Sequence, residues 1–305
     1  MLTLAMLGRD TAVRRLRAQG LRLQTGPFVN CIHSPLDGLA DLLLAMYGDY
    51  PVLSDEGVAD FHLRLVPGRG LRRWLRPQVF FEYAGQAPFQ PLPRDQLFPM
   101  LEWSLNWCVS AHAQSWLIIH AAVVERHGKA VILPAPSGSG KSTLCAALVS
   151  RGWRLLSDEL TLVRLDDGRI DPNPRPVSLK NQSIDILRAF AAQQVFTDPV
   201  ADTVKGTVAH MRAPADSVLR AGEAAEPAFV VFPRFAADAG LALEEVAPAR
   251  AFFRLAENAF NYNLLGAAGF EAVAGVVGRC RSYDVSYSSL DEALGAFERL
   301  VAGPC

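Results

Sequence analysis

The stretch LPAPSGSGKST, residues 133–143, has the residue types of a loop that holds the phosphates of a nucleotide. Gly138 and Gly140 let the backbone approach an anion without a Cβ in the way. Lys141 has the length to reach the β and γ phosphates, and the Ser142 hydroxyl can ligate Mg²⁺. The residues expected to bind phosphate are Ser137, Gly138, Ser139, Gly140, Lys141, Ser142 and Thr143.

One position departs from the usual G-x-x-x-x-G-K-[ST] pattern, because Ala135 stands where the first glycine is expected. We expect the alanine to be tolerated if the backbone there does not need a positive φ. The run KAVILPA before the loop predicts a strand, and STLCAALVSRG after it predicts a helix that ends at Gly152. The alternative, a Gly-Ser turn before an ordinary helix, does not explain the positions of the lysine and the hydroxyls.

Two adjacent acidic residues, Asp158 and Glu159 in LLSDEL, follow Lys141 by seventeen residues. Phosphoryl transfer needs a carboxylate that holds metal and a group that takes the proton of the nucleophile. Neighbouring side chains on a strand point to opposite faces, so both reach one site only if the strand ends there. The sequence leaves open which of the two is base and which is metal ligand, and whether one is purely structural.

His120 lies inside the apolar run LIIHAAVV, which predicts a buried strand. A lone histidine in such a strand is usually a core residue with satisfied hydrogen bonds. A functional role gains weight here because this strand is expected to lie beside the strand that leads into the loop.

The composition is that of a globular protein, with 305 residues, 50% of them hydrophobic and 20% charged. The net charge of −1 predicts no general attraction to nucleic acid or to an anionic membrane. No apolar run is long enough to span a bilayer, and the N-terminus has its basic residues after its apolar ones, the reverse of a secretory signal. The scattered cysteines predict reduced thiols in a cytoplasmic protein; they are Cys31, Cys108, Cys145, Cys280 and Cys305.

The chain is expected to divide near residue 115. Residues 1–115 carry no nucleotide signature, and their short β-branched and aromatic runs predict a smaller α/β module of unknown role. Its last helix, FPMLEWSLNWCVSAHA, has Trp103 and Trp107 at helical spacing, which we expect in the core. Residues 116–305 alternate strands and helices around the loop, which predicts an α/β catalytic domain.

Residues 119–163 resemble the catalytic core of bacterial HPr serine kinase/phosphorylase. They share a strand with a histidine, a hairpin, the glycine-rich loop, and an acidic pair after R-G-x-R-L, where Arg151 and Arg154 match. The strings LEWSLNWC, PVSLKNQSIDILRAF, GTVAHMR, VVFPRF and RLAENAFNYN resemble the subgroup called HPr-kinase-related kinase A. The resemblance implies a P-loop kinase core akin to that of phosphoenolpyruvate carboxykinase, a mixed twisted sheet with flanking helices.

The resemblance also implies a reaction, the Mg²⁺-dependent transfer of the γ-phosphate of ATP to a hydroxyl, such as a serine of a protein or peptide. It implies that Lys141 and Ser142 bind the phosphates and Mg²⁺, and that Asp158 takes the proton of the acceptor. It further implies that Glu159 helps to hold the metal and that His120 supports the acidic site, so Asp158, His120 and Lys141 are the expected catalytic residues. The related kinases form oligomers, which makes a homo-oligomer one expectation.

Several positions depart from the family pattern. Ala121 replaces the glycine after the histidine, Glu159 replaces an aspartate, and RIDPNPRPVSLKNQS stands where true HPr kinases have a glycine-rich second signature. The acceptor is therefore open between a protein or peptide serine and a small molecule, and a nucleotide-binding regulator or scaffold without phosphotransfer is the third alternative. Basic candidates near the site are Lys180, Arg175, Lys205 and Arg212; each is expected to be a surface charge, and Lys180 is the favoured candidate among them.

Overall fold

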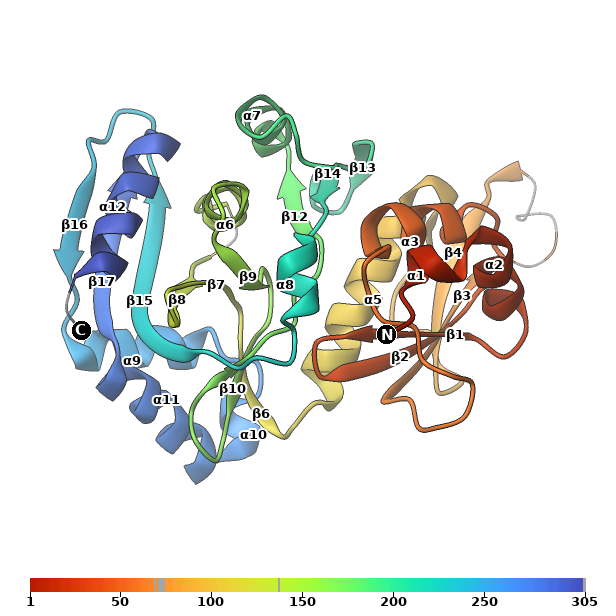
Figure 1. Ribbon diagram of the computed structural model, residues 1–305, viewed down its shortest axis with the longest axis horizontal. Helices are drawn as coiled ribbons and strands as arrows, with labels where there is room; N and C mark the ends of the chain where they lie inside the picture. Colours follow the sequence, from red (N-terminus) through yellow and green to blue (C-terminus); the bar gives the residue numbers. More distant parts are fainter. Residues whose placement is uncertain (69, 71–74, 137, 304–305) are drawn as a thin grey trace.

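The computed structural model describes residues 1–68, 70, 75–136 and 138–303. Within these ranges the chain forms four β-sheets with helices packed around them (Figure 1). The mixed α/β class expected from the sequence is thereby confirmed. The five-stranded sheet is built from residues before 115 and the other three sheets from residues after 115.

The N-terminal part is one sheet in the order β1-β2-β3-β4-β5, with β2 and β3 parallel and the other neighbours antiparallel. Its strands are β1 (Leu21–Thr25), β2 (Phe28–His33), β3 (Phe61–Pro67), β4 (Gln78–Tyr83) and β5 (Leu92–Pro93). Its helices are α1 (Leu4–Leu7), α2 (Arg9–Arg17), α3 (Leu39–Tyr47), the 3₁₀ turn η1 (Arg94–Gln96) and α5 (Leu97–His112). Along β3, buried Phe61, Leu63 and Leu65 alternate with exposed His62 and Arg64, so one face of the sheet packs on helices and the other faces outward.

The largest sheet has six strands in the order β16-β17-β15-β8-β7-β9. They are β7 (Ala121–Arg126), β8 (Lys129–Pro134), β9 (Arg154–Ser157), β15 (Glu226–Phe235), β16 (Ala242–Glu245) and β17 (Arg281–Tyr287). β15 is parallel to β8 and to β17. β7 is antiparallel to both β8 and β9, so β9 runs in the same direction as β8.

Two smaller sheets of three strands complete this half, in the orders β11-β10-β6 and β12-β14-β13. Their strands are β6 (Trp116–Ile119), β10 (Thr161–Arg164), β11 (Ile170–Asp171), β12 (Val177–Lys180), β13 (Val200–Thr203) and β14 (Gly206–Met211). The helices after residue 115 are α6 (Lys141–Ser150), α7 (Gln182–Phe190), α8 (Ala215–Leu219), α9 (Pro248–Glu257), α10 (Tyr262–Leu265), α11 (Ala267–Arg279) and α12 (Leu290–Ala302).

The run LIIHAAVV, predicted as one strand, is instead divided between two strands that belong to different sheets. β6 pairs with β10, whereas β7 pairs with β8 and β9, and the chain changes sheet at His120. The His120 N–H donates to the Asn258 carbonyl at 2.7 Å, and the Phe260 N–H donates to the Ile118 carbonyl at 2.8 Å. The segment after α9 therefore holds the chain at this change of sheet.

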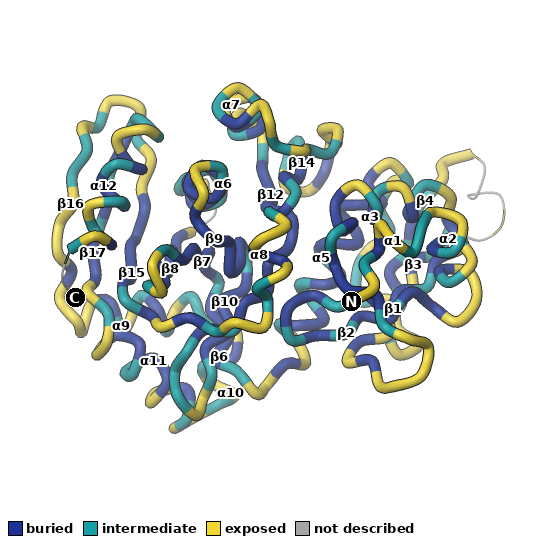
Figure 2. The backbone as a smooth tube through the Cα atoms, in the orientation of Figure 1, coloured by how far each residue is buried: buried dark blue, intermediate teal, exposed yellow. Residues whose placement is uncertain are grey.

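The two parts of the chain share buried contacts. One hydrophobic cluster includes Leu21 and Phe81 of the N-terminal sheet together with Leu144 of α6 and Phe297 of α12. Figure 2 shows that most of α5 is buried between the two parts. Trp107, expected in the core, is half-buried and packs against the edge of the core, with its ring centroid 5.7 Å from that of Phe81. Trp103, also expected in the core, is only half-buried because it faces the cavity described below.

The four cysteines within the described ranges, Cys31, Cys108, Cys145 and Cys280, are free thiols, as predicted, and Cys305 lies outside those ranges. Among the helices that the structure describes, none combines the length and the hydropathy needed to cross a bilayer.

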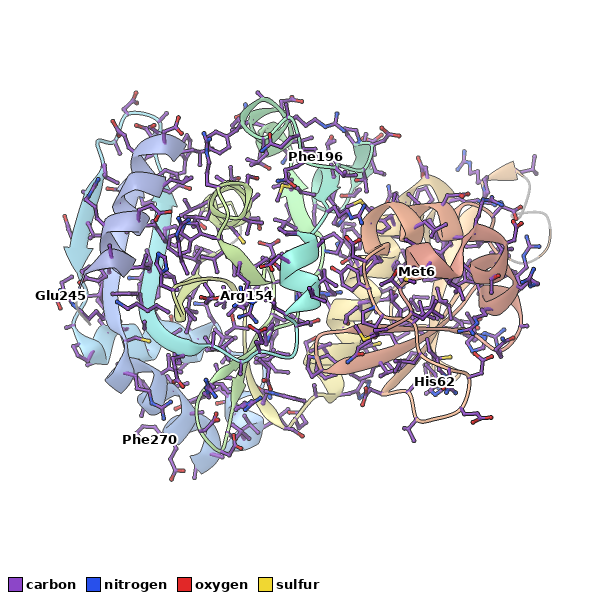
Figure 3. All side chains as sticks on the ribbon, viewed as in Figure 1. Met6, His62, Arg154, Phe196, Glu245 and Phe270 are labelled. Carbon is purple, nitrogen blue, oxygen red and sulfur yellow. The ribbon has the colours of Figure 1, made fainter. Side chains whose placement is uncertain are left out.

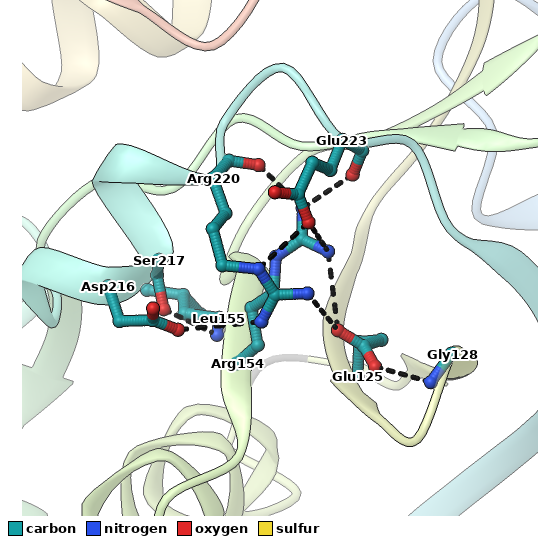
Figure 4. Close-up of polar contacts among 8 residues, drawn as sticks. All are labelled: Glu125, Gly128, Arg154, Leu155, Asp216, Ser217, Arg220 and Glu223. Carbon is teal, nitrogen blue, oxygen red and sulfur yellow. Dashed lines mark hydrogen bonds and ion pairs between the residues drawn. The ribbon is translucent and has the colours of Figure 1, made fainter.

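A buried ion cluster lies at the beginning of β9, at the opposite end of that strand from the acidic pair (Figure 4). Arg154 and Glu125 are each 5% exposed in their side chains and lie 3.2 Å apart, Nη1 to Oε2. Arg154 also donates to the carbonyls of Arg220 and Glu223, and Glu125 accepts from the Gly128 N–H. Arg154, one of the residues that carry the family resemblance, therefore anchors the end of a strand and lies away from the loop.

Candidate active site

The candidate site lies along the edge of the six-stranded sheet where its parallel strands end. β8 leads into the loop, and β9 runs in the same direction and leads into Asp158 and Glu159. β7 runs the opposite way, so it begins at this edge, directly after His120. Pairing of β7 with both β8 and β9 therefore brings the loop, the acidic pair and the histidine to one place.

The loop has the backbone conformation that its glycines permit. Gly138 and Gly140 have φ angles of 87° and 91°, the left-handed region where a Cβ causes strain. A Cβ on Gly140 would also lie 2.8 Å from the Tyr287 hydroxyl at the end of β17. Within the described ranges, Ala135 is not among the non-glycine residues with positive φ, so an alanine fits this position without backbone strain. Ser137 lies outside the described residues.

Backbone and side-chain donors of the loop meet at the start of α6. The N–H groups of Lys141, Ser142 and Thr143 have no acceptor inside the helix, because they belong to its first turn. The Lys141 side chain is buried, with the residue 7% exposed, and within the described structure its Nζ has no hydrogen-bond partner. A buried, unpaired ammonium group is costly, so this arrangement favours a bound anion.

Asp158 is buried beside Lys141, with 5% of the residue exposed. Its Oδ2 accepts a 3.0 Å hydrogen bond from the Ser178 N–H, while Oδ1 has no partner among the described residues. Burial and the charge of Glu159 raise the pKa of Asp158 to about 6, against the opposing effects of Lys141, the Ser178 N–H and the nearby Ser142 hydroxyl. A carboxyl group with a pKa near neutrality is suited to proton exchange.

Glu159 and His120 form a pair at the same edge. His120 Nε2 lies 3.0 Å from Glu159 Oε2. Burial opposes the charged form of Glu159, but the hydrogen bond with His120 and the charge of Lys141 outweigh it and hold the pKa of Glu159 well below its usual range. β9 ends at Ser157, so both acidic residues follow the strand and neither is forced to the opposite face.

A polar cavity of about 20 Å³ lies beside Asp158 and Glu159, a volume that holds about one water molecule. Helix α5, the segment before β12 and the strand β14 all contribute to its walls. The buried atoms without a hydrogen-bond partner among the described residues include Asp158 Oδ1, Asn173 Oδ1, Arg175 Nη1 and His210 Nε2. The lining residues are Glu102, Trp103, Asn106, Ser157, Asp158, Glu159, Asn173, Arg175, Pro176, Ser178 and His210.

The prediction that Arg175 lies on the surface is wrong. Arg175 is buried, its Nη1 lies 3.5 Å from Glu102 Oε2, and it donates a hydrogen bond to Asn106 Oδ1. Tyr47 donates its hydroxyl proton to Glu102 as well. The sequence carried one signal for this network, because Glu102 and Asn106 are polar residues four positions apart in a mostly apolar helix.

The other basic candidates lie at the periphery. Lys180 is half-buried, and its charge contributes to the low pKa of Glu159. Lys205 is exposed, as expected, with its Nζ 5.1 Å from the centroid of the Trp103 ring. Arg212, half-buried, pairs with Asp49 at 2.5 Å and so joins the N-terminal part to the segment after β14.

His210, for which the sequence indicated no role, is buried in the wall of the cavity against Phe98, with ring centroids 5.0 Å apart. Burial, aided by Arg175 and opposed by Glu159, lowers the pKa of His210 to about 3. The unfolded chain therefore binds a proton on this residue between about pH 6.5 and pH 3, whereas the folded chain does not. The contribution of neutral His210 to stability is present above that window and is lost as the pH falls through it.

We expect the free energy of unfolding to fall by about 2 kcal/mol more in the wild type than in His210→Gln between pH 7 and pH 5. Urea unfolding of both proteins at each pH, with EDTA present, measures this difference. Because the comparison is of slopes against pH, a constant destabilisation by the glutamine does not affect it. Equal slopes for the two proteins would show that His210 takes up a proton as readily in the folded chain as in the unfolded chain, which would contradict the lowered pKa.

This chain has limited similarity to known proteins. Residues 92–178 match the family described as ScmC, SynChlorMet cassette protein ScmC, which is well under half of the chain. The matched segment contains α5, His120, the loop, the acidic pair and Arg175. No curated protein matches the chain.

Among solved structures, the chain is similar to the HPr(Ser) kinase/phosphatase from Coxiella burnetii, with 14% sequence identity and a TM-score of 0.27, over 61% of this chain and 97% of that chain. At that TM-score the similarity does not establish a common fold. What these comparisons identify is a segment similar to the ScmC family that spans most of the residues of the candidate site.

Proposed function

We propose that this protein is an ATP-dependent phosphotransferase that moves the γ-phosphate to an acceptor hydroxyl. One observation carries the proposal: Lys141 Nζ and Asp158 Oδ1 are both buried, oppositely charged and without hydrogen-bond partners among the described residues, at the strand edge that also holds the loop. A purely structural pair of this kind would satisfy its polar atoms within the fold. A γ-phosphate beside Lys141 and an acceptor hydroxyl beside Asp158 would satisfy both.

The architecture we propose is a P-loop core of the HPr kinase/phosphoenolpyruvate carboxykinase type in residues 116–305, with a smaller α/β module in residues 1–115. The supporting features are the strand–loop–helix around Lys141, the acidic pair after a strand parallel to it, and the histidine at the start of the strand between them. Within this proposal the N-terminal module has a role, because α5 forms one wall of the cavity beside Asp158.

The residues at the edge fit Mg²⁺ as well as nucleotide phosphates. Ser142 and Glu159 supply a hydroxyl and a charged carboxylate, which are hard oxygen ligands of the kind that Mg²⁺ takes together with phosphate oxygens. Bound there, Mg²⁺ would neutralise charge on the β and γ phosphates. Glu159 stays ionised and oriented through His120, and Lys141 and the N–H groups of Gly138 and residues 140–143 bind the phosphate oxygens.

Asp158 is the residue we assign to the acceptor. Its Oδ1 accepts the proton of the hydroxyl as the oxygen–phosphorus bond forms and the bond from the γ-phosphorus to the leaving oxygen of ADP breaks. The polar cavity beside Asp158 has room for a group of about the size of a hydroxyl. The acceptor we propose is a serine of a protein or peptide, with the hydroxyl of a small molecule as the alternative.

Thermal unfolding with and without Mg²⁺ and ATP tests the loop. At 100 times its dissociation constant, ATP should stabilise the wild type by about 2.7 kcal/mol. Lys141→Ala should lose most of this increment, since the ammonium group that meets the phosphates is gone. Arg14→Ala, which removes an exposed cation on α2, should keep the increment and serves as the control. The same increment in Lys141→Ala as in the wild type would remove the loop from the proposed mechanism.

A further inference from the structure

Three potential metal ligands gather on the outer face of the N-terminal sheet, away from the candidate active site. Cys31 and His33 are two residues apart on β2, and His62 on β3 is the register partner of Cys31. Because side chains alternate along a strand, all three lie on the face opposite to the core residues Ile32 and Leu63. Figure 3 shows His62 in the N-terminal part of the molecule, far from Arg154 and the six-stranded sheet.

The ligand atoms are already near the spacing of a tetrahedral zinc site. One sulfur and two ring nitrogens lie within 4.8 Å of one another. The Sγ of Cys31 is 3.5 Å from Nε2 of His33. Zinc bonds of about 2.3 Å to sulfur and about 2.0 Å to nitrogen at a tetrahedral angle would separate these atoms by roughly 3.6 Å. Cys31 Sγ and His33 Nε2 are therefore already at the separation that a shared zinc ion requires.

The backbone before β1 is shaped to leave these two atoms room. Gly20 has a φ of 91°, and a Cβ at this position would lie 2.5 Å from Cys31 Sγ and 2.7 Å from His33 Nε2. Cys31 is 1% exposed although it lies on the outer face of the sheet, because this turn covers it. His62 is exposed, so the site is closed on the cysteine side and open on the side of His62, where a fourth ligand can enter.

The charges around the cluster favour a metal that takes thiolate and imidazole over a hard cation. Arg22 and Arg64 lie on the same face, which disfavours weakly bound Ca²⁺ or Mg²⁺. Arg22 is the register partner of Cys31 and also donates to the Ser54 carbonyl at 3.3 Å, while Arg64 Nε lies 3.8 Å from Glu82. Cysteine and histidine are the usual ligands of zinc, and their covalent-like bonds outweigh a moderate charge repulsion.

We propose that Cys31, His33 and His62 bind one Zn²⁺, with water in the fourth position. Binding forms one sulfur–zinc and two nitrogen–zinc bonds, and the proton of the Cys31 thiol is released to solvent. The metal would link β2 to β3 beneath the Gly20 turn and so stabilise the N-terminal part of the chain. This site is separate from the proposed phosphotransferase site and does not depend on it.

Titration of the metal-free, full-length protein with Co²⁺ as a spectroscopic substitute for Zn²⁺ tests the site. The wild type should develop the sulfur-to-cobalt charge-transfer band with one equivalent, and Zn²⁺ should displace it. Cys31→Ser should lack the band, and His62→Ala should need at least tenfold more Co²⁺. The controls are Cys280→Ser, which removes another cysteine, and His127→Asn, which removes an exposed histidine at a left-handed position that asparagine tolerates; both should bind as the wild type does.

The charge-transfer band distinguishes this site from the candidate active site, where Co²⁺ would bind carboxylate oxygen and His120 without a sulfur ligand. Absence of the band in the wild type, or its persistence in Cys31→Ser, would overturn the proposal. Should Cys31→Ser fail to fold by circular dichroism, His62→Ala decides, because its exposed side chain can be removed without disturbing the core. Binding by His62→Ala with unchanged affinity would also overturn the three-ligand site.

Discussion

Phosphate transfer from ATP is expected to fall about 10²–10⁴-fold when Asp158 is replaced by asparagine. The substitution keeps the shape of the side chain and an oxygen for the Ser178 N–H, but the amide cannot take a proton. Binding of Mg²⁺ and ATP should be retained, since Lys141 and the loop are unchanged. The measurement is labelled product after incubation of each protein with Mg²⁺, γ-labelled ATP and lysate of the native host.

The control for this experiment is Asp216→Asn, which removes an exposed carboxylate on α8 and should leave the rate unchanged. Product formation by Asp158→Asn at the wild-type rate would show that Asp158 does not act as the base. ATP-induced thermal stabilisation without any Asp158-dependent product, across several growth conditions, would instead favour the nucleotide-binding regulator or scaffold.

Arg154→Met is expected to destabilise the fold by about 3–5 kcal/mol, because it leaves Glu125 as a buried charge without its main partner. The two side chains are each 5% exposed and lie 3.2 Å apart. Arg220, whose Nη2 lies 3.7 Å from Glu125, compensates only in part because it is itself paired with Glu223. Two backbone carbonyls also lose the donor that Arg154 provides. The free energy of unfolding from urea denaturation measures the loss.

Arg151→Met supplies a matched control from the same R-G-x-R element. Its partner Asp291 is 3.4 Å away and both side chains are more than half exposed, so the expected loss is about 0–1 kcal/mol. The double variant Arg154→Met with Glu125→Leu should recover part of the loss, because it removes the unpaired charge. A loss below about 1 kcal/mol for Arg154→Met alone would contradict the buried-charge explanation.

The sequence determined the local structure around the loop. The glycines at 138 and 140, the lysine and hydroxyls after them, and the apolar runs on both sides specify a strand, a loop and a helix through short-range geometry. The helix α5 was likewise predicted from nearby residues, as was the free state of the described cysteines. These features depend on residues close in the chain, where periodicity and turn residues are informative.

Only the tertiary structure decided how distant segments meet. His120 lies at a change of sheet because β6 pairs with β10 and β7 with β9, a choice that an uninterrupted apolar run does not reveal. Burial of Arg175 and His210 beside Asp158 depends on α5 packing against the segment before β12. The grouping of Cys31, His33 and His62 likewise follows from the register of β2 against β3. Strand order and register are set by contacts between segments far apart in the chain, and one sequence carries no direct signal of which partners will adjoin.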